Sequence, residues 1–143
     1  MPAAVIYYSE TGNTKKIAEA IARGTKARCE PVEKGGEAVK GADLLFVGTP
    51  VHSFGPSRPI LEFLRKTDWS GKRVALFCTY AGLGNRRTLR KMRKEVEKRG
   101  GKVVGEFWCK GRFKFMRKGK PDAEDERRAE EFGKNMASGQ GAS

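Results

Sequence analysis

A run of six residues near the N-terminus concentrates hydroxyl and amide side chains at one point of the chain. The run comprises Ser9, Glu10, Thr11, Gly12, Asn13 and Thr14. Hydroxyl groups can donate hydrogen bonds to an anion, and a glycine lets the backbone turn tightly. The first N–H groups of a following helix lack partners within that helix and lie at its positive end. The run therefore predicts a phosphate-binding loop, since an ordinary helix N-cap needs only one such side chain.

The spacing within this loop disfavours two kinds of nucleotide site. A triphosphate pocket of the Walker type needs GxxxxGK[ST], and the segment GNTK lacks that spacing. The dinucleotide fingerprint GxGxxG is also absent. Glu10 would repel a bound anion, so we expect its carboxylate to point to solvent.

Two later loops carry groups that suit a flat heteroaromatic ring. The first contains Thr49, Pro50, Val51, His52, Ser53, Phe54 and Gly55. The second contains Thr79, Tyr80, Ala81, Gly82, Leu83 and Gly84. Such a ring needs aromatic or apolar surfaces on its faces and backbone groups along its polar edge. His52, Phe54 and Tyr80 are the aromatic candidates; the alternatives are that Phe54 folds into the core and that Tyr80 only closes a strand.

Short apolar runs alternate with amphipathic stretches along the whole chain. The predicted strands are residues 3–8, 27–33, 43–48, 73–78 and 102–109. Pro31 marks the second strand as an edge strand, because proline cannot donate to a central ladder. The near-continuous apolar character of the other strands implies helices on both faces of a parallel sheet. All three polar loops would then leave the carboxyl ends of strands, where such sheets bind ligands.

The helices between these strands have recognisable ends and faces. Ile17 and Ile21 form a stripe on a first helix that Gly24 is expected to end. A second helix runs through residues 60–64 and a third ends near residue 99. Asp122, with Asp125 three positions later, predicts the N-cap of a last helix that buries residues 129 and 132.

The motif S-x-T-G-N-T after the first strand resembles the FMN phosphate loop of the flavodoxin family. The resemblance covers essentially the whole chain, including residues 49–55 and 79–84. It implies an α/β fold: a flavodoxin-like doubly wound three-layer sandwich whose five-stranded parallel sheet has the order 2-1-3-4-5. One domain would span residues 1–137, followed by a flexible tail at 138–143. The cofactor implied is FMN, with its phosphate on residues 9–14 and its ring between the other two loops. By the same resemblance, Gly55 would permit a backbone rotation that presents a carbonyl to the flavin.

The positive charge of the chain is concentrated in one segment. The 143 residues carry a net charge of +13, and residues 86–120 hold 15 Lys and Arg against 3 acidic residues. Leu89, Met92 and Val96 share one helical stripe, so the cations of residues 86–94 should coat the opposite, solvent side. Three interpretations stay open: a solvated basic surface, a docking face for an acidic redox partner, and a nucleic-acid surface suggested by Phe113 and Phe115 among lysines.

The remaining composition bears on the class of function. No CxxC or Cys/His cluster is present, so we expect no metal site and treat Cys29, Cys78 and Cys109 as buried reduced thiols. No stretch approaches the ~18 apolar residues of a membrane helix, and no signal peptide is recognised, so a cytoplasmic protein is expected. We also expect a monomer.

No acid–base pair or activated nucleophile is evident near the three loops, which favours chemistry supplied by the flavin. The leading hypothesis is therefore an electron carrier that shuttles electrons between redox proteins with acidic docking surfaces. The alternatives are an FMN-dependent NAD(P)H or quinone oxidoreductase and a basic binding module of the same fold.

Overall fold

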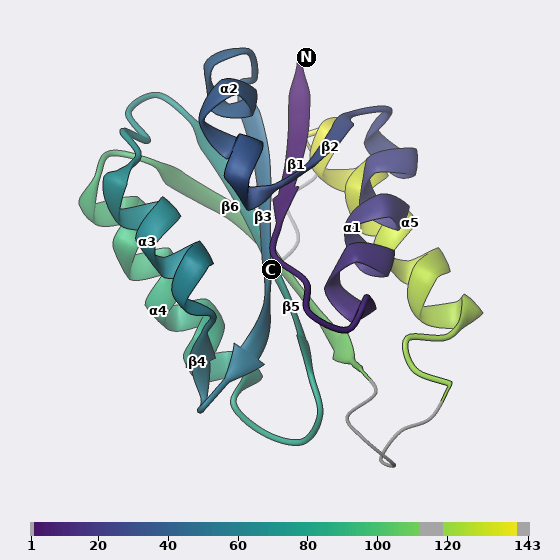
Figure 1. The fold of residues 1–143 in the computed structure, drawn as a ribbon. Coiled ribbons are helices and arrows are strands. Elements are labelled where there is room, and N and C mark those ends of the chain that lie inside the picture. The colour runs from purple at the N-terminus through teal and green to yellow at the C-terminus, as the bar shows by residue number, and fades with distance from the viewer. Residues whose placement is uncertain (1, 112–118, 140–143) are drawn as a thin grey trace.

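A computed structural model of the chain describes residues 2–111 and 119–139 and places a parallel sheet between two layers of helices (Figure 1). Its five long strands are β1 (Ala3–Tyr7), β2 (Arg28–Pro31), β3 (Leu44–His52), β5 (Arg73–Tyr80) and β6 (Lys102–Lys110). They lie in the order β2-β1-β3-β5-β6, and all four neighbouring pairs are parallel. Counted along the chain this is the predicted order 2-1-3-4-5. The two-residue strand β4 (Gly55–Pro56), which pairs antiparallel with β3, was not predicted.

The helices cover both faces of the sheet (Figure 1). They are α1 (Asn13–Thr25), α2 (Gly35–Lys40), α3 (Arg58–Lys66), α4 (Asn85–Lys98) and α5 (Ala123–Ala137), with a 3₁₀ turn at Val32–Lys34. Strand residues alternate between two cores, as the period of a strand requires. Val5 and Phe46 pack with α1 and α5, whereas Ile6 and Val47 pack with α3 and α4.

The first and last helices approach closely through two glycines. A side chain on Gly24 would place its Cβ 2.0 Å from the carbonyl oxygen of Glu130, and one on Gly133 would lie 2.4 Å from that of Ile21. The expectation that Gly24 ends the first helix was wrong. Gly24 lies inside α1 because the contact with α5 leaves no room for a side chain, and Lys26 in the left-handed conformation forms the C-cap.

The predicted start of the last helix is confirmed. Asp122 accepts a hydrogen bond from the N–H of Asp125 (2.9 Å), and Asp125 accepts one from the N–H of Asp122 (3.0 Å), which is a capping box. The Lys120 ammonium (2.8 Å) and the N–H of Asp125 stabilise the Asp122 carboxylate and lower its pKa to about 2. Ala129 and Phe132 are buried, as predicted.

Three details differ from the sequence expectations or lie outside the described residues. Helix α2 was not predicted, because it has only six residues and two of them are glycines, which are poor helix formers. It packs because Gly35 lies against the ring of Phe63, where a Cβ would be 2.6 Å away. Cys29 is only half-buried, whereas Cys78 and Cys109 are buried as expected. Of the predicted tail, residues 138–139 are described and 140–143 are not.

Candidate functional site

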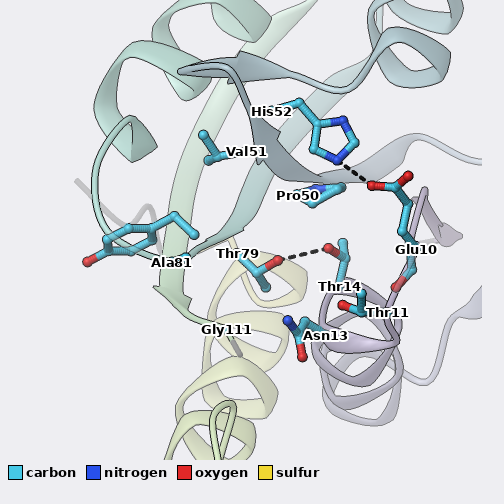
Figure 2. A pocket seen from close by; sticks show the side chains of 12 residues that line it. Glu10, Thr11, Asn13, Thr14, Pro50, Val51, His52, Thr79, Ala81 and Gly111 are labelled. Carbon is cyan, nitrogen blue, oxygen red and sulfur yellow. Dashed lines mark hydrogen bonds and ion pairs between the residues drawn. The ribbon is translucent and has the colours of Figure 1, made fainter. Parts of the chain in front are cut away.

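The three polar loops meet around one cavity at the carboxyl ends of β1, β3 and β5 (Figure 2). The cavity has a volume of about 170 Å³. Its lining comprises Ser9, Glu10, Thr11, Asn13, Thr14, Pro50, Val51, His52, Thr79, Tyr80, Ala81 and Gly111. The strand order reverses between β1 and β3, so the cavity lies at the topological switch point of the sheet, where ligands of such folds bind.

The first loop ends in a helix start that no side chain caps. Gly12 is the N-cap of α1, with φ of 94° in the left-handed region that glycine tolerates best. Its N–H donates to Ser9 Oγ at 3.1 Å, and no side chain caps the helix. The alternative of an ordinary side-chain N-cap is therefore wrong for this loop. The first turn of α1 presents backbone donors beside the hydroxyls of Ser9 and Thr11, which is an arrangement suited to an anion.

A hydroxyl pair ties this helix to the neighbouring strand. Thr14 Oγ1 and Thr79 Oγ1 lie 2.9 Å apart, and both residues are almost fully buried (Figure 2). One hydroxyl donates to the other, so one proton of the pair is free to donate elsewhere in the cavity. The contact fixes the start of α1 relative to the end of β5.

Glu10 was expected to point to solvent, but its carboxylate bridges to the second loop. Its Oε1 lies 2.6 Å from His52 Nε2, with the two side chains 53% and 39% exposed (Figure 2). The ring of Tyr8 meets that of His52 edge-on, with centroids 6.5 Å apart. When His52 is protonated, the pair offsets the negative charge that Glu10 would otherwise bring to the phosphate loop.

The second loop is a tight hairpin with an unusual backbone. His52 pairs with Gly55 in the β3–β4 ladder, which leaves only Ser53 and Phe54 in the turn. Both have positive φ (48° and 64°), the pattern of a type I′ turn, where Asn-Gly is preferred. Two non-glycine residues here store strain of about 1–2 kcal/mol each. Phe54 is 54% exposed, so it does not fold into the core.

Buried polar contacts anchor the base of this hairpin. The N–H of Ser57 donates to Thr49 Oγ1 at 2.9 Å, and the two hydroxyls lie 2.9 Å apart. Thr49 is fully buried and therefore supports the loop from beneath rather than lining the cavity.

The third loop packs against the hairpin through Gly84. This glycine is the N-cap of α4 with φ of 100°, and it too has no side-chain cap. A Cβ at Gly84 would lie 2.9 Å from Val51 Cγ1 and 3.0 Å from Phe54 Cα, so only glycine permits this approach. Leu83, which precedes it, is 75% exposed.

The structure thus separates the predicted site residues into two groups. Eleven of them line the cavity, whereas seven shape the loops around it without lining it: Gly12, Thr49, Ser53, Phe54, Gly55, Gly82 and Gly84. The sequence reasoning missed one lining residue, Gly111, whose N–H donates to the Tyr80 carbonyl at 2.9 Å. A Cβ there would lie 2.7 Å from the Asn13 amide nitrogen. The available signal was a glycine directly after the last strand, at the carboxyl edge of the sheet.

The thiols are not poised for chemistry. Burial raises the pKa of Cys29 to about 11 and that of Cys109 to about 12, and it raises the pKa of Cys78 further still. Within residues 2–111 and 119–139, no group of three or more His, Cys, Asp or Glu side chains could hold a metal ion.

A protein-family model described as a flavodoxin domain matches residues 4–135. The chain belongs to the flavodoxin family. An uncharacterised protein of Methanocaldococcus jannaschii is 27% identical in an alignment of 148 positions. The alignment covers 95% of this flavodoxin-family chain and 98% of the relative.

Solved structures resemble this flavodoxin-family chain at the level of fold. A flavodoxin from the domain Archaea superposes with a TM-score of 0.76 at 24% identity, covering 98% of this chain and 99% of its own. A flavodoxin, WrbA-like protein from Agrobacterium tumefaciens gives a TM-score of 0.77 at 23% identity, with coverage of 97% and 96%. In the described part of the chain, the helices are too short or too polar to cross a membrane.

Proposed function

We propose that the protein binds FMN in this cavity and uses it to carry electrons between redox proteins. The observation that supports this most strongly is the uncapped start of α1, which opens into the same cavity as the two ring-binding loops. A phosphate there would accept hydrogen bonds from backbone N–H groups and from the hydroxyls of Ser9 and Thr11. Thr14 would add its hydroxyl if Thr79 donates to it.

The rest of the cavity fits the flavin ring. Pro50, Val51, Tyr80 and Ala81 give it apolar and aromatic walls. When bound, FMN supplies the electron chemistry, and these residues hold and orient its ring. Pockets that enclose a drug-sized ligand commonly measure about 300–1,000 Å³. This cavity measures about 170 Å³, so a flavin ring here would remain partly exposed. Partial exposure suits a carrier that passes electrons to another protein.

The test compares FMN with riboflavin, which lacks the phosphate. Titration of the apoprotein, followed by flavin fluorescence, should give an FMN dissociation constant at least 100-fold lower than that of riboflavin. Equal affinities would remove the phosphate loop from the proposal. Failure of both to bind would overturn the FMN function itself.

The Glu10–His52 pair favours a second candidate, an FMN-dependent NAD(P)H or quinone oxidoreductase. A histidine held at 2.6 Å by a carboxylate is suited to delivering a proton near the ring. The FMN-loaded protein would then oxidise NAD(P)H by itself in the presence of a quinone, and His52→Gln would slow that reaction. No turnover above that of free FMN would rule this candidate out.

A further inference from the structure

The exposed side of α4 carries a row of cations with no partners. The row consists of Arg86, Arg87, Arg90, Lys91 and Lys94, and we call it the α4 basic stripe. Within the described residues none of the five makes an ion pair or side-chain hydrogen bond, whereas nearby Arg93 pairs with Glu97 (3.4 Å) and Glu106 (3.2 Å). The stripe is thus an uncompensated part of the surface charge on this helix.

The placement of these cations opposes the stability of the helix itself. Arg86 and Arg87 lie in the first turn, at the positive end of the helix dipole, and no acidic residue accompanies them there. Arg86 and Arg90, as well as Arg90 and Lys94, are like charges four residues apart, which destabilises a helix. Charges arranged at such a cost point to an anionic partner that compensates them.

The stripe is continuous with exposed apolar side chains beside the proposed flavin cavity. Helix α4 begins directly after Leu83 and Gly84, and Phe54 lies against Gly84. Leu83 is 75% and Phe54 54% exposed. The Lys91 side chain reaches back to the hairpin, because a Cβ on Gly55 would lie 3.6 Å from its Nζ. Apolar anchors with a charged rim are the ordinary composition of a protein–protein interface.

We infer that this face docks an acidic protein, with Leu83 and Phe54 as apolar anchors and the α4 basic stripe as the charged rim. The inference rests on the proposed electron-carrier function, because a partner docked here would lie beside the ring-binding loops. The exposed apolar surface supports a protein over a nucleic acid, because Leu83 offers a base neither a charge nor an aromatic face. A groove between α4 and β6 is lined by Arg86, Arg90 and the exposed Trp108, which extends the apolar surface of this face.

The test measures binding of the full chain to an acidic plant-type [2Fe–2S] ferredoxin by calorimetry, at 20 mM and 300 mM salt. The variant Arg86→Gln/Arg90→Gln/Lys94→Gln removes three stripe charges. The matched control removes three exposed, unpaired cations elsewhere: Lys34→Gln/Lys40→Gln/Lys134→Gln. At low salt we expect at least 10-fold weaker binding for the stripe variant and a change below 2-fold for the control. At high salt the wild type and the stripe variant should bind with similar affinity.

One further variant and two other binding partners distinguish the remaining outcomes. Leu83→Ala, at an exposed position, should weaken the complex 3-fold or more. Equal losses in stripe and control variants, or equal binding of basic cytochrome c, would overturn the inference. Binding of polyuridylate rather than ferredoxin, lost only in the stripe variant, would replace the acidic protein by a nucleic acid. Since calorimetry of the complex does not require FMN, failure of docking and failure of flavin binding are read separately.

Discussion

The buried hydroxyl pair Thr14–Thr79 allows a quantitative test of how the candidate site is built. Thr14→Val removes one hydroxyl of a 2.9 Å hydrogen bond and leaves the other buried without its partner; Thr79→Val does the converse. The bond itself contributes about 1 kcal/mol, and an unsatisfied buried hydroxyl costs about 1–3 kcal/mol. Each single variant should therefore lose about 2 kcal/mol of unfolding free energy. With a urea m-value of about 2 kcal/mol/M, this lowers the urea midpoint by about 1 M.

The double variant distinguishes a coupled pair from two independent side chains. Because valine has nearly the shape of threonine, replacing both hydroxyls removes the unsatisfied group, and the double variant should lose no more than either single variant. FMN titration of the same proteins should show about 10-fold weaker binding for Thr14→Val, the loss of about 1.4 kcal/mol, and a smaller effect for Thr79→Val. Strictly additive losses of stability would refute the reasoning, as would an FMN affinity unchanged by Thr14→Val.

Three further predictions concern packing, pH and the thiols. Gly24→Ala should lower the free energy of unfolding in urea by about 2 kcal/mol, because its Cβ would meet the α5 backbone. Gly36→Ala, where a Cβ has open space, should raise it by about 1 kcal/mol. An increase in both variants would contradict the packing argument. Because the pKa of Asp122 is lowered in the folded protein, its carboxylate stabilises the fold above pH 4, and this contribution is lost as the pH falls to about 2. The difference in urea midpoint between the wild type and Asp122→Asn should therefore shrink over that range. A difference that stays constant would contradict this account. With the pKa of Cys29 near 11, about one such thiol in a thousand is ionised at pH 8, so Ellman's reagent should react slowly with the folded protein and fast after urea addition.

The sequence predicted the sheet because its signals are local. Four of the five long strands are largely apolar runs, and the loops at their carboxyl ends carry their own polar residues, so the parallel sheet and the position of the site follow from general rules. The strand order came from the resemblance to the flavodoxin family. The last helix was predicted from Asp122 and Asp125 for the same reason. By contrast, Gly24 looked like a helix end, because the sequence does not show that the α5 backbone occupies the space of its side chain.

The candidate site also combines features that local sequence shows with features that arise only when the chain folds. The phosphate loop was predicted from the residues Ser9 to Thr14, but the bridge from Glu10 to His52 depends on two loops meeting in space. Gly111 was missed because its role is to leave room beside Asn13. The predicted nucleic-acid signal of Phe113 and Phe115 lies outside the described residues. The predicted helical stripe of Leu89, Met92 and Val96 is buried, so the basic side of α4 faces solvent as expected.

The close contact between α1 and α5 also has a consequence for the order in which the protein becomes functional. The helix that follows the predicted phosphate loop is translated well before its packing partner, because α5 lies far downstream in the sequence. Lys16 of α1 further donates a 2.7 Å hydrogen bond to the carbonyl of Pro121, just before α5. A chain truncated before residue 121 would retain the whole S-x-T-G-N-T motif but lack the support that holds its helix in place. Under the proposed function, tight FMN binding would therefore require that α5 has been synthesised.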